Sequence, residues 1–148
     1  GEKMSFGPIH IDHIGIATNS LDQASLFWNL IGLQMSANDE TVADQGVTTR
    51  FFSTSSIQGE HDHPPMVELL EPTGPNTPIG KFLDKRGPGV QQVCFRVGDL
   101  QGLIGHLIDN GVVMIDETPR LGAGGKRIAF VHPKSTGGVL VELTESNH

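Results

Sequence analysis

The sequence has one cysteine, no cluster of basic side chains and no long apolar run, and each absence excludes a class of protein. Cys94 has no partner for a disulfide within the chain, so we expect it to be a small buried core residue in a reducing, cytoplasmic compartment. A formal charge of −7 without a basic cluster argues against binding to nucleic-acid phosphates. No apolar run approaches the roughly 20 residues of a membrane-spanning helix, so we expect a soluble protein with no membrane partner.

The chain consists of two related halves. An offset of 79 residues aligns the start of one half with the start of the other and pairs His13 with Gln92. Near the end of each half the offset falls to 74 and pairs 67–69 with 141–143, because the first half holds five extra residues within 53–65. The shared order of strand, helix, glycine and terminal Val-Glu-Leu favours a duplication over chance similarity.

Each half is expected to fold as a βαβββ module, which makes the chain an α+β protein. A capping box at Ser20 and Gln23 begins the first helix, and Asp99 begins the second. Phe27 and Trp28 of the first helix are expected in the core. We predict strands at 11–17, 34–37, 47–53, 66–70, 90–97, 112–116, 127–132 and 139–144. The whole chain, 1–148, is then one domain: a module at about 9–72, a connecting helix at about 77–86 and a module at about 89–146.

Alternation along the last strand of each half turns a carboxylate away from the helices. Val141 and Leu143 share the face expected to contact the helix layer, so Glu142 lies on the opposite face. The same alternation sets Glu68 against its apolar neighbours. A carboxylate between apolar residues is costly unless something satisfies it. Two such carboxylates at duplicated positions therefore favour a shared ligand.

A divalent metal ion would satisfy both carboxylates. His13 and Gln92, at the other pair of duplicated positions, would complete a set of four ligands with Glu68 and Glu142. Imidazole and carboxylate ligands suit zinc, cobalt, nickel or manganese, and an amide oxygen is a weaker neutral ligand. The alternative from the residues alone is that both glutamates pair with basic side chains at the sheet edge and that His13 is a hydrogen-bonded core histidine.

Three segments carry a family resemblance that covers nearly the whole chain: IDHIGIAT, VELLEPTGPNTPIGKFL and RLGAGGKRIAFVHPKSTGGVLVELTE. They resemble the vicinal-oxygen-chelate superfamily and, within it, the methylmalonyl-CoA epimerases. The resemblance implies two βαβββ modules that form a U-shaped mixed sheet around one metal ion. It implies ligand positions at His13, Glu68 and Glu142.

The sequence departs from the epimerase pattern at two positions. Gln92 stands where these epimerases have a metal-binding histidine, which gives a set of one Gln, one His and two Glu similar to that of animal glyoxalase I, with Gln and His exchanged between halves. Thr49 stands where some epimerases have a glutamate that acts on the second face of the substrate. The resemblance implies that Glu142 is both a ligand and the catalytic base on the first face, and a threonine hydroxyl is a poor base.

Other residues are candidates for contacts with substrate. Arg96 shares the face of Gln92 and could neutralise a substrate carboxylate or pair with a nearby acidic residue. Lys126 and Lys134, with Arg127, surround the final hairpin and could contact CoA phosphates, although solvated basic residues at a turn are common. Thr49 completes the set of candidate substrate contacts. The triplet 61–63 (His-Asp-His) is expected to be a solvated loop that could also cover the site or supply a ligand.

The resemblance implies a metal-dependent acyl-CoA epimerase that acts as a homodimer. It would remove the C2 proton of methylmalonyl-CoA while the metal stabilises the enolate. Two alternatives stay open: a glyoxalase-type isomerase or lyase that acts on a small carbonyl compound, and a non-catalytic member of the fold that binds a small ligand. The shared fold alone does not choose among them.

Overall fold

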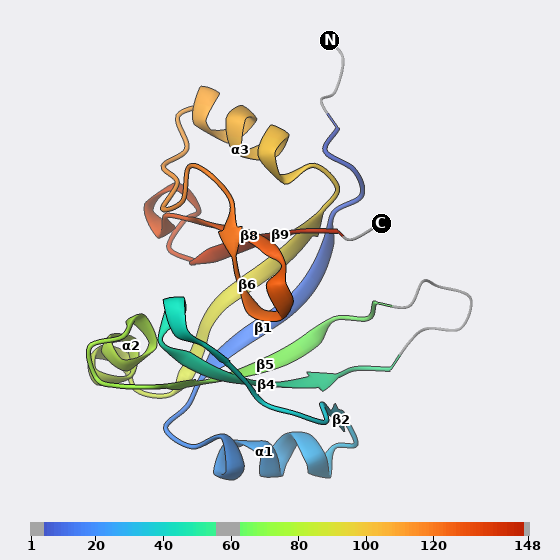
Figure 1. The fold of residues 1–148 in the computed structure, drawn as a ribbon, viewed down its shortest axis with the longest axis vertical. Coiled ribbons are helices and arrows are strands. Elements are labelled where there is room, and N and C mark those ends of the chain that lie inside the picture. Colours follow the sequence, from blue (N-terminus) through green and yellow to red (C-terminus); the bar gives the residue numbers. More distant parts are fainter. Residues whose placement is uncertain (1–4, 56–62, 147–148) are drawn as a thin grey trace. The chain divides into compact units, whose positions relative to one another are not determined.

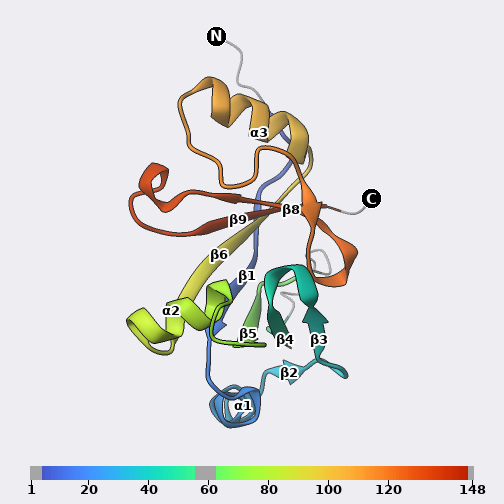
Figure 2. The ribbon, with the colours of Figure 1, turned by 60° about the vertical axis from the view of Figure 1, so that its left-hand side comes forward.

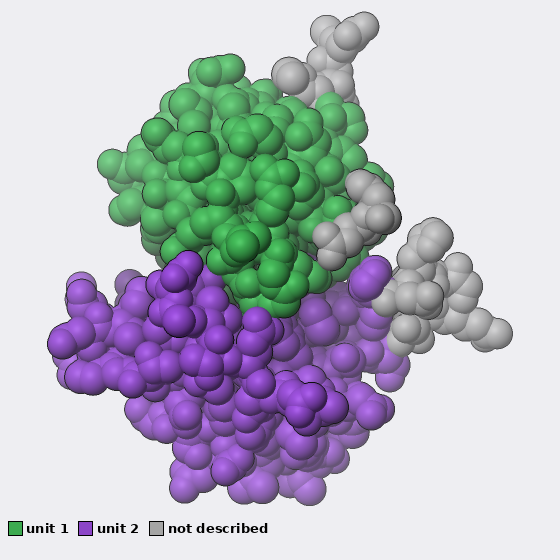
Figure 3. Space-filling model, viewed as in Figure 1, with its two compact units in different colours: residues 1–11, 92–148 green, residues 12–91 purple. Residues whose placement is uncertain are grey.

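The computed structural model describes residues 5–55 and 63–146, and the chain divides into two compact units. Unit 1 contains residues 1–11 and 92–148, and unit 2 contains residues 12–91, as coloured in Figure 3. Each unit contains most of one sequence repeat. In the described part of the chain, no helix is long and apolar enough to span a membrane.

Unit 2 is a mixed sheet covered by helices (Figure 1). The strand order is β2-β4-β5-β1, with β3 paired to β4; β1 runs parallel to β5, and β4 runs antiparallel to it. Its elements are β1 (His10–Ala17), α1 (Leu21–Leu30), β2 (Gln34–Met35), β3 (Glu40–Val42), a 3₁₀ turn (Ala43–Gln45), β4 (Val47–Ser53), β5 (Met66–Pro72) and α2 (Pro78–Arg86). Thr77 caps the start of α2 and Gly87 follows its end, so the predicted connecting helix is confirmed.

Unit 1 repeats this plan (Figure 2). Its strand order is β6-β9-β8-β7, with β6 parallel to β9 and β8 antiparallel to β9. Its elements are β6 (Gly89–Val97), α3 (Leu100–Asp109), β7 (Arg120–Leu121), β8 (Arg127–Val131), β9 (Val141–Glu145) and two 3₁₀ turns (Ala123–Gly125 and Pro133–Ser135). The expected strand at 112–116 is reduced to one bridge between Met114 and Val131. The predicted α+β class with two βαβββ modules is confirmed.

The strand register repeats with the same offsets as the sequence. Each site glutamate has repeat-equivalent neighbours on the adjoining strands: Glu68 pairs with Gly15 and Phe51, and Glu142 pairs with Cys94 and Phe130. The helix starts also correspond, because the Leu21 N–H donates to Glu71 Oε1 at 3.2 Å and the Leu100 N–H donates to Glu145 Oε2 at 3.1 Å. Capping by Ser20 and by Asp99 is confirmed. The two halves are therefore structural repeats, and the carboxylates at the helix starts were not predicted.

The core packing determines which face of each sheet is left for a site. Val141 and Leu143 pack in the apolar cluster that contains Leu100 and Ile104 of α3, so Glu142 faces away from that helix, as predicted. Cys94 is fully buried, which confirms its predicted environment. In α1 the prediction for Phe27 was wrong. Its side chain is 58% exposed, because α1 buries only the side that carries Leu21, while Trp28 is partly buried.

Arg50 of β4 connects three segments of unit 2. Its guanidinium donates two hydrogen bonds of 2.8 Å to the Asp39 carboxylate and one each to Asp22 Oδ1 (3.0 Å) and Ser25 Oγ (2.9 Å). The hydrogen bonds from Arg50 lower the pKa of Asp39, and those to Asp39 raise the pKa of Arg50. This network lies outside the pair of residues described below as the candidate metal centre in unit 2.

Two repeat-equivalent glycines allow a matched test of backbone conformation. Gly46 (φ +62°) and Gly125 (φ +70°) both have left-handed backbone, which costs other residues about 1–2 kcal/mol. A Cβ on Gly46 would also lie 2.4 Å from Thr77 Cγ2, and Thr77 is held in place by its capping bond to the Gly80 N–H. We expect Gly46→Ala to lower the free energy of unfolding by about 3 kcal/mol and Gly125→Ala by roughly half of that, as measured by urea denaturation. Equal losses would contradict the contact with Thr77.

Candidate metal centre

Unit 2 holds a buried histidine–carboxylate pair. His13 of β1 and Glu68 of β5 are 6% and 4% exposed, and His13 Nε2 lies 3.1 Å from Glu68 Oε1. The ring of Phe51, the residue paired with Glu68 on β4, meets the His13 ring edge-on at a centroid distance of 5.7 Å. One imidazole nitrogen and one carboxylate oxygen are thus held close together with little access to solvent.

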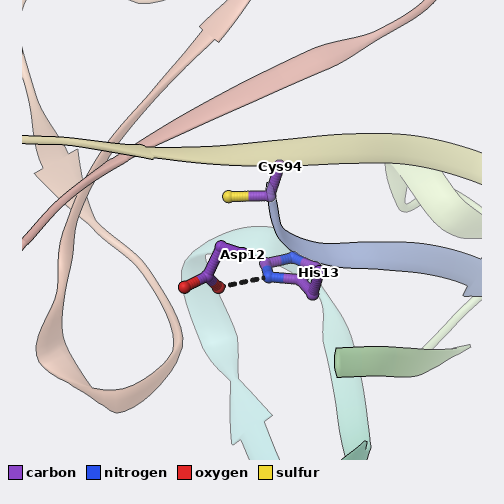
Figure 4. Close-up of side chains that lie close together, drawn as sticks. All are labelled: Asp12, His13 and Cys94. Atoms are coloured by element: carbon purple, nitrogen blue, oxygen red, sulfur yellow. Dashed lines mark hydrogen bonds and ion pairs between the residues drawn. The ribbon is translucent and has the colours of Figure 1, made fainter. Parts of the chain in front are cut away.

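Asp12 binds the other nitrogen of this imidazole (Figure 4). His13 Nδ1 lies 2.7 Å from Asp12 Oδ2, and the ring N–H is the donor because a carboxylate only accepts. Asp12 is 4% exposed, so this contact is buried as well. The sequence analysis missed Asp12, although an acidic residue within an otherwise apolar strand was a usable signal.

Unit 1 holds the repeat-equivalent pair. Gln92 of β6 and Glu142 of β9 are each 6% exposed, and Gln92 Nε2 donates a hydrogen bond of 2.6 Å to Glu142 Oε1. Coordination by Gln92 would use its Oε1, and rotation of the amide by half a turn exchanges the positions of Oε1 and Nε2. The pair therefore offers one carboxylate and one amide oxygen.

The chemistry of the donors fits a divalent metal ion. One imidazole, two carboxylates and one amide oxygen are donors that zinc, cobalt, nickel or manganese accept. A second carboxylate on the non-coordinating nitrogen of a histidine ligand, as Asp12 provides for His13, is the usual outer-shell arrangement at metal sites. The donors in each unit, taken by themselves, are thus suitable for a metal centre.

The candidate substrate contacts occupy different environments. Thr49 is 2% exposed and lies on the same face of β4 as Phe51, with its hydroxyl donating to Glu40 O at 3.4 Å. Arg96 is half-buried on β6 and shares the face of Gln92 by alternation, opposite Thr144 of β9.

The basic residues near the final hairpin differ in their contacts. Arg127 forms an ion pair of 3.0 Å with Glu145, the same carboxylate that caps the start of α3. Lys126 is half-buried just before β8, and Lys134 is exposed in a 3₁₀ turn. Of the triplet 61–63, His63 is exposed, and the first two residues lie outside the described part of the chain.

Comparison with known proteins agrees with this geometry. The family model described as the Glyoxalase/Bleomycin resistance protein/Dioxygenase superfamily matches residues 12–130. An uncharacterized Bacillus subtilis protein is 40% identical over 136 residues, with 91% of each chain covered. The mitochondrial methylmalonyl-CoA epimerase of Dictyostelium discoideum is 37% identical over 137 residues, which cover 91% of this chain and 77% of that protein.

A solved structure extends the likeness to the fold. A Streptomyces coelicolor methylmalonyl-CoA epimerase variant in complex with 2-nitronate-propionyl-CoA has a TM-score of 0.84 and 35% identity, with 93% of this chain and 94% of that chain covered. The match to the family model spans most of the sequence, including His13, Glu68 and Gln92. The chain belongs to the glyoxalase/bleomycin resistance protein/dioxygenase superfamily, and it is related there to the methylmalonyl-CoA epimerases.

Proposed function

We propose that this protein is a metal-dependent acyl-CoA epimerase and that methylmalonyl-CoA is its substrate. The observation that carries the proposal is the presence of two buried pairs, His13–Glu68 and Gln92–Glu142, at repeat-equivalent positions in a chain related to methylmalonyl-CoA epimerases. The acyl-CoA derivative bound to the Streptomyces relative supports the same class of ligand here.

The proposed ligands of one divalent ion are His13, Glu68, Gln92 and Glu142. When bound, the ion would supply positive charge that stabilises the enolate formed during epimerisation. A homodimer is part of the proposal. Arg96, Lys126 and Lys134 are the proposed contacts for the anionic groups of the substrate.

Glu142 is the proposed base on one face of the substrate. Its carboxylate takes the C2 proton while the electron pair of the C–H bond moves into the thioester carbonyl. The hydrogen bond from Gln92 Nε2 fixes the orientation of this carboxylate in the absence of substrate. Inversion then requires a proton to be delivered to C2 from the opposite face.

Thr49 is a poor candidate for that second step. Its hydroxyl is buried and directed to the backbone carbonyl of Glu40, and it has no proton to exchange near neutral pH. We therefore expect water to deliver the proton on this face, and we expect that step to be slow relative to removal and return of the proton by Glu142.

Exchange of the C2 hydrogen with solvent deuterium tests the proposed function. Metal-loaded protein is incubated with methylmalonyl-CoA of one configuration in deuterium oxide, and proton NMR follows the loss of the C2 signal. A coupled assay for the other configuration follows inversion. We expect exchange to exceed inversion and both to stop when a chelator removes the metal. Absence of both reactions in metal-loaded protein would overturn the proposal.

Gln92→His is expected to tighten metal binding on the order of tenfold, because a neutral imidazole is a better donor to these metals than an amide oxygen. A competition titration with a chromophoric chelator at constant pH gives the dissociation constant. Gln91→His is the matched control, since alternation turns residue 91 to the other face of β6. Unchanged affinity in Gln92→His would place Gln92 outside the ligand set.

Two further functions remain as alternatives within the superfamily. The matching family model includes glyoxalases, and the proposed ligand types resemble those of animal glyoxalase I, which favours a small carbonyl substrate as the second candidate. The commitment of the Thr49 hydroxyl to Glu40 favours a third candidate, a protein that binds an acyl ligand without turnover. Metal-dependent isomerisation of a thiol-adduct substrate would identify the second, and acyl-CoA binding without exchange would identify the third.

A further inference from the structure

We propose that Asp12 is a positioning residue that orients His13 for metal binding. The inference rests on the proposed function, because it assumes that His13 Nε2 is a metal ligand. It concerns a residue that the sequence analysis did not single out, and all the contacts that support it lie within unit 2.

The geometry gives the two nitrogens of His13 different roles. Nδ1 lies 2.7 Å from Asp12 Oδ2, and Nε2 lies 3.1 Å from Glu68 Oε1 (Figure 4 shows the first contact). A proton held on Nδ1 by Asp12 leaves the Nε2 lone pair of a neutral imidazole directed to the side where Glu68 lies. Asp12 thereby selects the tautomer that can bind a metal and fixes the angle of the ring.

The internal repeat supplies an independent comparison. The offset of 79 residues pairs Asp12 with Gln91 and His13 with Gln92. Where the proposed ligand is an imidazole, its neighbour is a carboxylate that accepts a hydrogen bond from the ring. Where the ligand is an amide, the neighbour is Gln91, whose buried Oε1 has no hydrogen-bond partner. The carboxylate thus occurs in the half that has a histidine to orient.

The packing around His13 adds a reason for the role of Asp12. Phe51 contacts the ring by its edge, a contact that restrains the ring but cannot select a tautomer. Only the hydrogen bond to Asp12 distinguishes the two nitrogens on the Nδ1 side. Loss of the Asp12 charge should therefore weaken metal binding even if the fold is kept.

Asp12→Asn tests the inference with a substitution of nearly equal size. We expect the dissociation constant for Co²⁺, measured by competition with a chelator, to rise about 10- to 100-fold. The visible spectrum of the bound Co²⁺ should change, because the ring is held less firmly. Asp39→Asn is the matched control: it removes a carboxylate from the Arg50 network in the same unit and should leave Co²⁺ affinity within twofold of the parent. Parental affinity and spectrum in Asp12→Asn would overturn the proposal.

A gain of affinity provides a second test that does not depend on the folding of Asp12→Asn. Gln91→Asp is added to the Gln92→His variant, which places a carboxylate beside a histidine in unit 1. We expect the double variant to bind Co²⁺ more tightly than Gln92→His alone, and equal affinity would count against the role of the carboxylate. If the parent binds no Co²⁺, the metal part of the proposed function fails; if it binds Co²⁺ and Asp12→Asn binds it equally, only the role of Asp12 fails.

Discussion

Glu142→Gln should lower the rate of C2 hydrogen exchange by about a thousandfold, because an amide of nearly equal size cannot accept the substrate proton. Proton NMR in deuterium oxide measures the rate with metal-loaded protein. Inversion should fall at least as far, since it requires the same proton removal. Part of the loss would come from weaker metal binding, so the metal content of the variant is measured in parallel and the rate is expressed per bound ion.

Glu145→Gln is the matched control for this prediction. Glu145 lies on the same strand but accepts from the Leu100 N–H and pairs with Arg127, so it belongs to the start of α3 and not to the candidate metal centre. We expect lower stability with an exchange rate within a few fold of the parent. An unchanged exchange rate in metal-loaded Glu142→Gln would rule out its role as the base.

Thr49→Glu should increase inversion roughly 100-fold while it changes exchange far less, because a carboxylate on this face of β4 can deliver the proton that threonine cannot. The ratio of inversion to exchange, measured in one reaction by NMR and the coupled assay, is the informative quantity. It is independent of the fraction of active protein.

Thr49→Gln controls for the larger side chain at this buried position. Residue 49 is 2% exposed and pairs with Leu70 of β5, so both longer side chains disturb the packing to a similar extent. Only the glutamate should raise the ratio. An increase in both variants would indicate that added space for water, and not an added acid, limits inversion in the parent.

Much of the fold could be predicted because the apolar pattern of each half is regular. The predicted strand at 47–53 has the observed bounds of β4, and the helix starts at Ser20 and Asp99 follow from local capping residues. The short strand β3 could not be predicted, since Glu40 and Thr41 are exposed and its pairing depends on the chain reversal into β4. The expected strand at 112–116 failed for a similar reason: the Val113 N–H donates to Ser135 Oγ and not to a neighbouring strand.

The candidate site was only partly accessible to sequence reasoning. Alternation alone placed Glu68 and Glu142 away from the helices, because each lies between apolar residues on a strand. The contact of Glu71 with the start of α1 joins residues 50 apart in the sequence, and no local pattern indicates it. Asp12 was missed because strand alternation places neighbouring side chains on opposite faces, whereas its carboxylate reaches His13 Nδ1.

The most direct test of the central claim is an anomalous difference map from crystals of the protein grown with Co²⁺, with data collected at the cobalt absorption edge. The account predicts one strong peak per chain, with His13 Nε2 and oxygen atoms of Glu68, Gln92 and Glu142 as its protein ligands. A peak that contacts the pair from only one repeat, or no peak at these residues in crystals of protein that binds Co²⁺ in solution, would contradict it.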